Sequence, residues 1–461
     1  MIMHAPNFDP RSVVVFGHRF HDVTFGEAVS WAVSRMKSGP PSYMATVNLD
    51  FVMQARRDPE MQRILLEADL VTADGDPLVR TSGLFGPRLR QRVTGSDLVP
   101  MLAGACADEG LKIFLLGGAD GVAEKTAAVL KIRNPGLKIC GTYAPPVTGL
   151  LDMNHGEILR RLRLAKPDLL LVAFGAPKQE KFINLHFRSW GIPLAVGVGA
   201  TFDFIAGVQK RAPSLMQKWG LEWLWRLGSD PRRLFRRYAS NLLFLVSTLK
   251  RLRRMYWHAP RLCWLQESKL DFGLCESGLL GRGQVIEVSI ADRDWLSSDD
   301  LGRIVGVAAH LRRRGGRLVL HGATPKLRQL LVEARLAGYL ELRGSEAEAR
   351  SRVGELRSGR TLGGMHFDGE RLVLRMPAEC SVSGLSRWVR TVSRGMAKQP
   401  ASVFLDAAES EYLDTAGVMW LLRTRRDCNR KGILFSTSRF RGSARRALLL
   451  AGVEQLFSPQ H

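Results

Sequence analysis

The stretch Leu169-Leu-Leu-Val-Ala-Phe-Gly175-Ala-Pro-Lys-Gln-Glu180 joins a continuous apolar run to a small, flexible and then highly polar loop. An apolar run without polar alternation favours a parallel strand that is covered on both faces. In open parallel sheets, ligands bind beyond the carboxyl ends of the strands. The stretch therefore predicts an α/β fold in which Lys178, Gln179 and Glu180 are presented to a ligand, although an ordinary strand-to-helix loop with solvated charges would read the same way.

The same alternation extends on both sides of this stretch, from about residue 10 to 210. Short apolar runs there are separated by helical patterns, which implies a mostly parallel sheet. Several of the runs end in loops that contain Gly or Asp, and we expect these loops to form one rim. The expected strands are Ser12–Phe16, Tyr43–Asn48, Leu70–Ala73, Leu111–Gly117, Lys138–Gly141, Asp168–Phe174 and Pro193–Gly197.

One of these loops, Gly117-Gly-Ala-Asp-Gly121, partly matches a nucleotide-binding fingerprint. Its glycines would allow close backbone approach, and the helix that follows would offer amide donors to a phosphate. The full glycine spacing of the dinucleotide motif is missing. A dinucleotide cofactor is therefore the less favoured interpretation.

Composition limits the class of protein. A chain of 461 residues suggests two or three domains, and a formal net charge of +23 with a pI near 10.4 indicates an anionic partner: a membrane surface, a nucleic acid or a phosphorylated substrate. The six cysteines have no paired spacing for zinc or a redox dithiol. The amino terminus lacks the pattern of a secretory signal, and no apolar run is long enough to span a bilayer. We expect a cytoplasmic protein whose membrane contact is peripheral.

Residues 211–261 have a different character, with tryptophans followed by an arginine-rich helix that begins at Pro231. Along this helix Leu234, Tyr238, Leu242, Leu245, Leu249 and Leu252 recur at three- and four-residue steps, and the cations lie off this stripe. A basic amphipathic helix of this kind suits either packing on the domain or docking on an anionic bilayer. We favour docking because cations and tryptophans coincide.

From about residue 283 the chain carries a degenerate repeat. Trp295–Leu301, a helix, Arg314–His321 and Ala334–Glu341 correspond to Tyr412–Val418, a helix, Arg430–Ser436 and Leu449–Gln455. The pattern predicts the same βαβα unit twice, with the polar stretch 343–364 between the copies as a linker.

Residues 12–247 closely resemble the WecG/TagA/CpsF-type glycosyltransferases, the N-acetylmannosaminyltransferase family. The resemblance implies an inverting, Rossmann-like enzyme that uses a nucleotide sugar, commonly a UDP-sugar, and a polyprenyl-diphosphate-linked acceptor. It rests on motifs in one order: Thr46-Val-Asn48-Leu-Asp-Phe51, Ala73-Asp74-Gly75, Arg92-Val-Thr-Gly-Ser-Asp97, Phe114-Leu-Leu-Gly-Gly118, Phe174-Gly-Ala-Pro-Lys-Gln-Glu180, Gly197-Val-Gly-Ala-Thr-Phe-Asp203, and Arg211-Ala-Pro213 with Glu222-Trp-Leu-Trp-Arg226.

The resemblance also implies roles for individual residues. Inverting transfer needs a carboxylate that deprotonates the acceptor hydroxyl, and Asp74 matches the family's proposed base, with helix capping or sugar binding as the alternative. The remaining matches are expected to bind substrate: Thr46 and Asn48 by orienting a sugar, Arg92 by its guanidinium fork, Lys178, Gln179 and Glu180 in the donor loop, and Asp203 at the next strand end. Thr46 and Asn48 are equally acceptable as turn residues.

Two further expectations follow from the family. Asp74-Gly-Asp76 has the spacing that binds a divalent cation in other glycosyltransferases, but metal independence is more usual in this family, so we predict no required cofactor. The family's carboxy-terminal appendage corresponds to about residues 211–255. Its arginines, here Arg226, Arg233 and Arg237, would meet the lipid diphosphate at the membrane.

The distal half resembles the STAS fold of anti-sigma-factor antagonists. Residues 366–457 cover a whole such domain, and 283–345 match only its later part. In that family a Ser or Thr after the Asp of the switch loop can be phosphorylated, and Thr415 occupies this position in Leu413-Asp-Thr-Ala-Gly417. The alternative is that both copies are interaction or dimerisation scaffolds.

Taken together, these features predict a membrane-associated glycosyltransferase of surface-glycan or exopolysaccharide synthesis, with a regulatory STAS-like region. The alternative is a catalytically decayed protein that recruits partners. Nucleic acid is not an expected partner, because no nucleic-acid-binding motif accompanies the charge. The expected parts are a catalytic α/β domain (10–210), a helical appendage (211–261), a partial STAS-like unit (283–345), a linker (346–364) and a STAS-like domain (365–458).

Overall fold

The computed structural model describes most of the chain outside the appendage. The described residues are 10–84, 86–209, 213, 216, 225, 239–240, 242–248, 250, 283–291, 293–358 and 363–457. Arg226, Arg233 and Arg237, for which we predicted a role at the membrane, lie outside them. Within the described residues, no helix has both the length and the apolar character needed to cross a bilayer.

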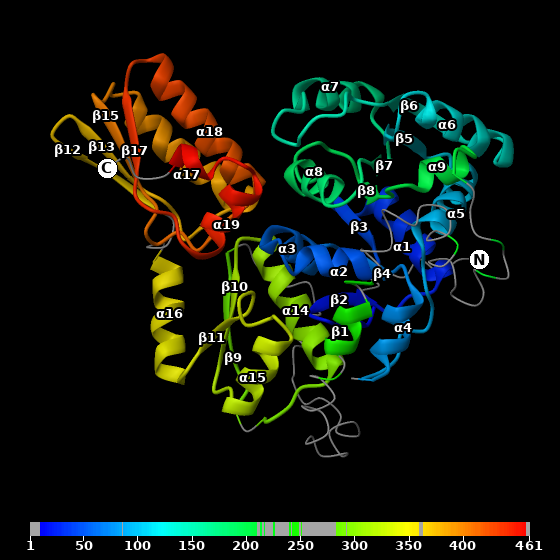
Figure 1. Cartoon of the computed structure of the whole chain (residues 1–461), viewed down its shortest axis with the longest axis horizontal. Coiled ribbons are helices and arrows are strands. Elements are labelled where there is room, and N and C mark those ends of the chain that lie inside the picture. Colours follow the sequence, from blue (N-terminus) through cyan, green and yellow to red (C-terminus); the bar gives the residue numbers. More distant parts are fainter. Residues whose placement is uncertain are drawn as a thin grey trace.

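A six-stranded parallel sheet forms the amino-terminal half (Figure 1), which confirms six of the seven expected strands. Their side chains are buried on both faces except in β6, as the absence of polar alternation predicted. In order across the sheet, the strands are β4 (Leu70–Ala73), β3 (Ser42–Val47), β8 (Leu194–Gly197), β7 (Leu169–Ala173), β5 (Lys112–Gly117) and β6 (Lys138–Tyr143).

Helices cover both faces of this sheet, and a separate apolar core lies on each face. One face carries α1 (Phe25–Ser38), α5 (Gly95–Asp108), α6 (Val122–Arg133) and α9 (Thr201–Ile205). The other carries α2 (Leu49–Ala55), α3 (Pro59–Glu67), α4 (Asp76–Ser82), α7 (His155–Ala165) and α8 (Lys178–His186). This three-layer arrangement is the doubly wound architecture that strands alternating with helices imply.

The seventh expected strand, Ser12–Phe16, does not join the sheet. It forms β1 (Ser12–Val15), which pairs antiparallel with β2 (His18–His21). Phe16 and Gly17 have positive φ angles of 52° and 79°, so the chain reverses there. No strand was predicted at β2, because three of its four residues are polar, although all four are buried.

Two smaller α/β units follow the appendage. The first has a three-stranded parallel sheet in the order β11-β10-β9, with β9 (Val285–Ser289), α14 (Ser298–Arg313), β10 (Arg317–His321), α15 (Pro325–Glu333) and β11 (Glu341–Arg343). The second, here called the C-terminal unit, has a four-stranded sheet in the order β12-β13-β15-β17 and a two-stranded pair, β14 with β16. Its elements are β12 (Gly364–Asp368), β13 (Arg371–Arg375), β14 (Glu379–Cys380), α17 (Val382–Met396), β15 (Ser402–Asp406), β16 (Tyr412–Leu413), α18 (Thr415–Arg430), β17 (Leu434–Thr437), α19 (Gly442–Leu450) and the 3-10 helix η3 (Glu454–Phe457).

The stretch expected as a linker is partly helical. It contains α16 (Glu346–Ser358), whose Ala349 and Val353 are buried against Val285 and Val319 of the three-stranded sheet. The high charge of this segment reflects one solvated face of a packed helix. The contact is made by the few apolar residues of α16, in which only five positions are alanine, valine, leucine or glycine, and these were too few to predict a helix.

One carboxylate, that of Glu379 in β14, joins three parts of the molecule. It binds Arg63 of α3, Arg312 of α14 and Arg317 of β10 at N···O distances of 2.9, 2.7 and 2.8 Å. Burial alone would raise the pKa of Glu379, but these guanidinium groups hold it well below its usual range. The C-terminal unit is therefore fixed to both preceding parts through a paired, ionised group.

We expect Glu379→Gln to destabilise the protein by about 3 kcal/mol, since it leaves three largely buried guanidinium groups without a carboxylate. Urea unfolding measures the loss. Glu409→Gln, an exposed position in the same unit, is the matched control and should change stability little. Equal stability of the two variants would contradict the role given to Glu379.

Candidate functional site

The carboxyl ends of the parallel strands meet at one edge of the six-stranded sheet, here called the rim. The loops that follow β3, β4, β5, β7 and β8 begin at this edge (Figure 1). Backbone hydrogen bonds continue past the strand ends: Gly118 N–H donates to Ala173 O at 2.9 Å, and Val198 N–H donates to Val172 O at 2.9 Å. The rim is thus an extension of the sheet, and residues from distant parts of the sequence are held side by side.

Asp74 and Arg92 lie next to each other at the end of β4. Asp74 N–H donates to Val47 O at 2.8 Å, and Val93 N–H donates to Ala73 O at 3.0 Å. Both side chains are half-buried. The rim therefore brings the backbone of Asp74 close to that of Arg92, 18 positions later in the sequence, and the roles of the two side chains stay predictions.

Asn48 and Thr46 stand beside Asp74 on β3. Asn48 Oδ1 accepts the backbone N–H groups of Asp50 and Phe51 at 3.0 and 3.2 Å and so caps α2. This cap is the structural role that we left open, and it leaves the amide nitrogen as the donor toward a ligand. Thr46 is buried where α5 begins: a Cβ on Gly95 would lie 3.1 Å from Thr46 Oγ1 and 3.4 Å from Thr201 Oγ1.

Gln179 and Glu180 begin α8, and both side chains are 1% exposed. Gln179 Oε1 accepts the backbone N–H groups of Gly175 and Gly199, each at 3.1 Å, and thereby ties the loop after β7 to the loop after β8. Its Nε2 donates to Glu180 Oε1 at 2.7 Å. The expectation that both side chains are displayed to a ligand thus needs correction: they shape the rim from within, and direct contact with a substrate stays a prediction.

Glycine is required at position 197 for this arrangement. A Cβ there would lie 2.8 Å from Gln179 Nε2 and 3.0 Å from Glu180 Oε1, closer than such atoms approach. Burial raises the pKa of Glu180 to about 7, although the hydrogen bond from Gln179 opposes this shift. The neighbouring Tyr43 hydroxyl is also buried. Gly197, Gly95 and Thr201 are the residues of this site whose roles the sequence did not suggest.

Lys178 and Asp203 differ in how far they reach the rim. Lys178 Nζ donates to the backbone carbonyl of Thr148 at 2.6 Å and lies 5.3 Å from the ring centre of Phe174. Burial lowers its pKa. Asp203 lies in α9 and is half-buried, which raises its pKa. Lys178 is thus tied to the loop that contains Thr148, whereas Asp203 is half-buried in α9, and the roles of both in substrate binding stay predictions.

Thr415 is at the start of α18 and contacts the catalytic half instead of solvent. Its N–H and Oγ1 donate to Glu60 Oε1 and Oε2 of α3, at 2.7 and 2.9 Å. Lys181 of α8 pairs with Glu60 and Asp58 at 2.9 and 2.7 Å. Burial, and then the charge of Glu60, raises the pKa of the adjacent Asp414. A phosphoryl group on Thr415 would meet the Glu60 carboxylate, so modification requires this contact to open.

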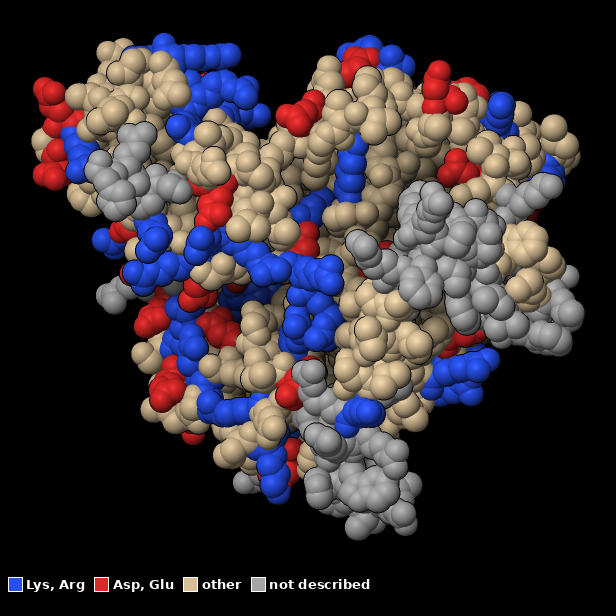
Figure 2. All heavy atoms as spheres, in the orientation of Figure 1, with Lys and Arg blue, Asp and Glu red and all other residues tan. Residues whose placement is uncertain are grey.

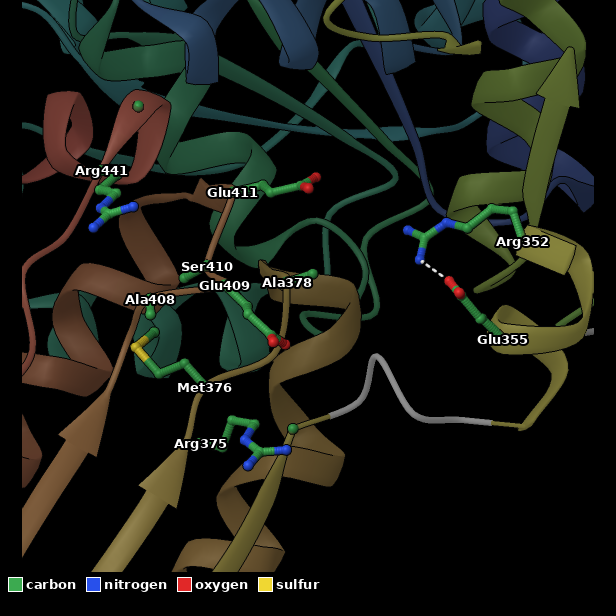
Figure 3. A pocket seen from close by; sticks show the side chains of 12 residues that line it. Arg352, Glu355, Arg375, Met376, Ala378, Ala408, Glu409, Ser410, Glu411 and Arg441 are labelled. Atoms are coloured by element: carbon green, nitrogen blue, oxygen red, sulfur yellow. Dashed lines mark hydrogen bonds and ion pairs between the residues drawn. The ribbon is translucent and has the colours of Figure 1, made fainter. Parts of the chain in front are cut away.

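Two cavities lie away from the rim, against the C-terminal unit. One of about 600 Å³ lies between α17, α18 and the end of α8. The other, of about 530 Å³, is shown in Figure 3 and separates the Arg352–Glu355 pair from Arg375, Glu409 and Arg441. Its lining mixes both charges evenly, which gives it no preference for an anionic or cationic ligand.

Comparison with known proteins identifies relatives of the half that contains the rim. The model of the glycosyl transferase WecG/TagA/CpsF family matches residues 13–257. An N-acetylglucosaminyldiphosphoundecaprenol N-acetyl-beta-D-mannosaminyltransferase from Bacillus spizizenii is 31% identical over 209 residues, which are 45% of this chain and 79% of that protein. A protein of the same name from Staphylococcus aureus is 28% identical over 213 residues, 46% of this chain and 82% of its own length.

We expect Glu180→Gln to change how stability depends on pH. The Glu180 carboxyl has an ordinary pKa of 4.5, and burial raises its pKa in the folded protein to about 7. The protonated carboxyl therefore contributes fully to the stability of the fold below pH 4.5, and this contribution is lost as the pH rises through 7. The variant avoids ionising a buried group. Relative to the parent protein, its free energy of unfolding should therefore rise by about 2 to 3 kcal/mol between pH 5 and pH 8.

Urea unfolding at the two pH values tests this. Glu409→Gln, at an exposed carboxyl, should differ from the parent equally at both. A difference between Glu180→Gln and the parent that is constant with pH would show that the carboxyl does not titrate in this range.

Proposed function

This chain belongs to the glycosyl transferase WecG/TagA/CpsF family, and we propose that it transfers an N-acetylmannosamine-like sugar from a UDP-sugar to a polyprenyl-diphosphate-linked glycan, with inversion at the anomeric carbon. The names of the relatives from Bacillus spizizenii and Staphylococcus aureus support this donor and acceptor class. The structural observation that supports the proposal most is the rim, where Asp74, Arg92, Asn48 and the Gln179 loop lie on one edge of the sheet.

Asp74 is the proposed base of the reaction. As the acceptor hydroxyl attacks C1 of the donor sugar, its proton passes to the carboxylate, and the bond from C1 to the diphosphate breaks. The hydrogen bond of Asp74 N–H to Val47 O fixes the backbone from which the carboxylate extends. A base held by the sheet needs little reorganisation before the proton transfer.

The departing diphosphate takes up negative charge, and the proposed partners for it are Arg92 and the backbone amides of the rim. Arg92 follows the strand end beside Asp74, where a guanidinium offers a planar fork of donors. α6 begins at the rim after Gly121 without a side-chain cap, so its first amides suit a phosphate. Asn48 through Nδ2, Thr46, Lys178 and Asp203 are proposed to orient the sugars.

A divalent cation is not needed in this proposal. Asp74 and Asp76 have a spacing that would suit one: Asp74 directly follows β4, and Asp76 is the first residue of α4 after the N-cap Gly75. If a cation does bind, these two carboxylates and the donor phosphates would hold it. The base would then be less available, so activity that depends on added metal would count against Asp74 as the base.

Peripheral attachment at the inner face of the cell membrane would bring the rim to a lipid-linked acceptor. The described part of the appendage supports this. Phe244 packs inward against Phe16, at 5.5 Å between ring centres, while Leu242 and Leu243 are 62% and 72% exposed. Within the predicted stripe, Leu242 faces outward, whereas Leu245 is half-buried against the core. Exposed leucines beside a basic helix suit the bilayer interface.

The C-terminal unit and the three-stranded unit are proposed to regulate or recruit, as STAS-like domains would. Both repeat the order strand, helix, strand, helix, with β9–α14–β10–α15 matching β15–α18–β17–α19. The Glu60–Thr415 contact gives the proposed phosphorylation of Thr415 a physical effect, since added charge there would separate α18 from α3.

We expect Asp74→Asn to lower kcat/KM for sugar transfer by about a hundredfold or more, because general-base catalysis is lost. Transfer of a labelled sugar to a prenyl-diphosphate-linked acceptor measures this across a panel of nucleotide sugars. Asp108→Asn, at an exposed aspartate that ends α5 away from the rim, is the control.

Near-normal transfer by Asp74→Asn would eliminate Asp74 as the base. A folded parent protein that is inert with every donor and acceptor would instead favour the alternative, a decayed enzyme that recruits partners.

A further inference from the structure

Four arginines from three separate segments meet where the C-terminal unit rests on the catalytic domain. Arg56 and Arg57 follow α2, Arg335 follows α15, and Arg446 lies in α19. Arg446 Nε donates to the backbone carbonyl of Arg57 at 2.7 Å, and Arg335 Nη1 donates to that of Arg56 at 2.8 Å. Figure 2 shows Lys and Arg side chains gathered across this junction, in the region of α2, α3 and α19.

The charges of Arg57, Arg335 and Arg446 are not neutralised by the contacts that hold them. Arg57, Arg335 and Arg446 are exposed, and within the part of the chain that the structure describes none of them pairs with a carboxylate. Their hydrogen bonds go to carbonyl oxygens, which position a guanidinium without cancelling its charge. Like charges held together in this way indicate an anionic partner.

Exposed leucines accompany the arginines. Leu449 and Leu450 of α19 are 55% and 44% exposed and stand three and four residues after Arg446, on the same helix face. On the other side of the cluster, the Arg56 guanidinium lies 4.8 Å from the ring centre of Phe244. That ring belongs to the segment that exposes Leu242 and Leu243. Cations and leucines therefore alternate over one continuous stretch of elements.

We propose that this junction surface, formed by Arg56, Arg57, Arg335, Arg446, Leu449 and Leu450, docks on an anionic lipid bilayer. A bilayer can bind both kinds of side chain, because the arginines face lipid phosphates while the leucines enter the interface. Nucleic acid would bind the arginines but would gain no affinity from the leucines. The inference rests on the proposed membrane-bound acceptor. It adds that the C-terminal unit takes part in attachment.

In this arrangement, membrane attachment depends on the contact between the C-terminal unit and the catalytic domain. Arg446 lies beside Arg57 only while α19 rests on the end of α2. The nearby Glu60–Thr415 contact holds the C-terminal unit in that position. If the C-terminal unit leaves this position, which requires the Glu379 ion pairs to open as well, the surface divides into two weaker parts. A signal that separates the C-terminal unit from the catalytic domain would then also weaken membrane binding, and with it access to the lipid-linked acceptor.

Vesicle sedimentation tests the proposal, with full-length protein and vesicles of phosphatidylcholine containing about one third phosphatidylglycerol. Each surface cation contributes about fivefold to binding, so Arg335→Gln combined with Arg446→Gln should weaken binding about 25-fold. Arg335→Lys combined with Arg446→Lys keeps the charge and should retain most of the binding. Arg390→Gln combined with Arg394→Gln, at two exposed arginines on α17, is the matched control and should bind as the parent does.

Unchanged binding by the double glutamine variant would overturn the proposal, and so would an equal loss when Arg390 and Arg394 are both replaced by glutamine, which would indicate a response to net charge alone. Competition by random DNA that abolishes vesicle binding would assign the surface to nucleic acid instead. Transfer to a water-soluble, short-prenyl acceptor is measured on the same preparations. Vesicle binding without any transfer by the parent protein would remove the proposed function and leave the docking surface standing.

Discussion

The side-chain oxygen of Gln179 holds the candidate site together. Oε1 accepts two backbone N–H groups, from Gly175 and Gly199, which lie in the loops after the neighbouring strands β7 and β8. Because the amide is buried, the two loops cannot separate without leaving polar groups unpaired, at a cost of about 1 to 3 kcal/mol for each. The buried Glu180 fixes the other end of the amide, and glycine at 197 makes the space for both.

The same helix connects the site with the rest of the molecule. Two residues after Gln179, Lys181 leaves the other side of α8 and pairs with Asp58 and Glu60, and Glu60 binds the start of α18. α8 therefore contacts the rim at its first turn and the seat of the C-terminal unit immediately afterwards. If the proposed functions are correct, α8 connects the catalytic rim with the contact that controls regulation and membrane docking.

The sequence predicted the parallel sheet and its rim because apolar runs and the loops after them are local signals. It did not predict that Gln179 faces inward, since its partners, Gly175 and Gly199, become neighbours only once β7 and β8 pair. The contact of Glu60 with Thr415 spans 355 positions and depends on how whole units pack. The hairpin β1–β2 was missed for a related reason: its polar residues are buried by α14 and α3, elements that local patterning does not place.

Hydrogen–deuterium exchange on a Gln179→Leu variant tests the central claim most directly, that one amide holds both loops. The account predicts that exchange at the Gly175 and Gly199 loops speeds up together, while Lys178→Met, one position earlier on α8, leaves the Gly199 loop protected. Protection of either loop that is unchanged in Gln179→Leu would contradict it.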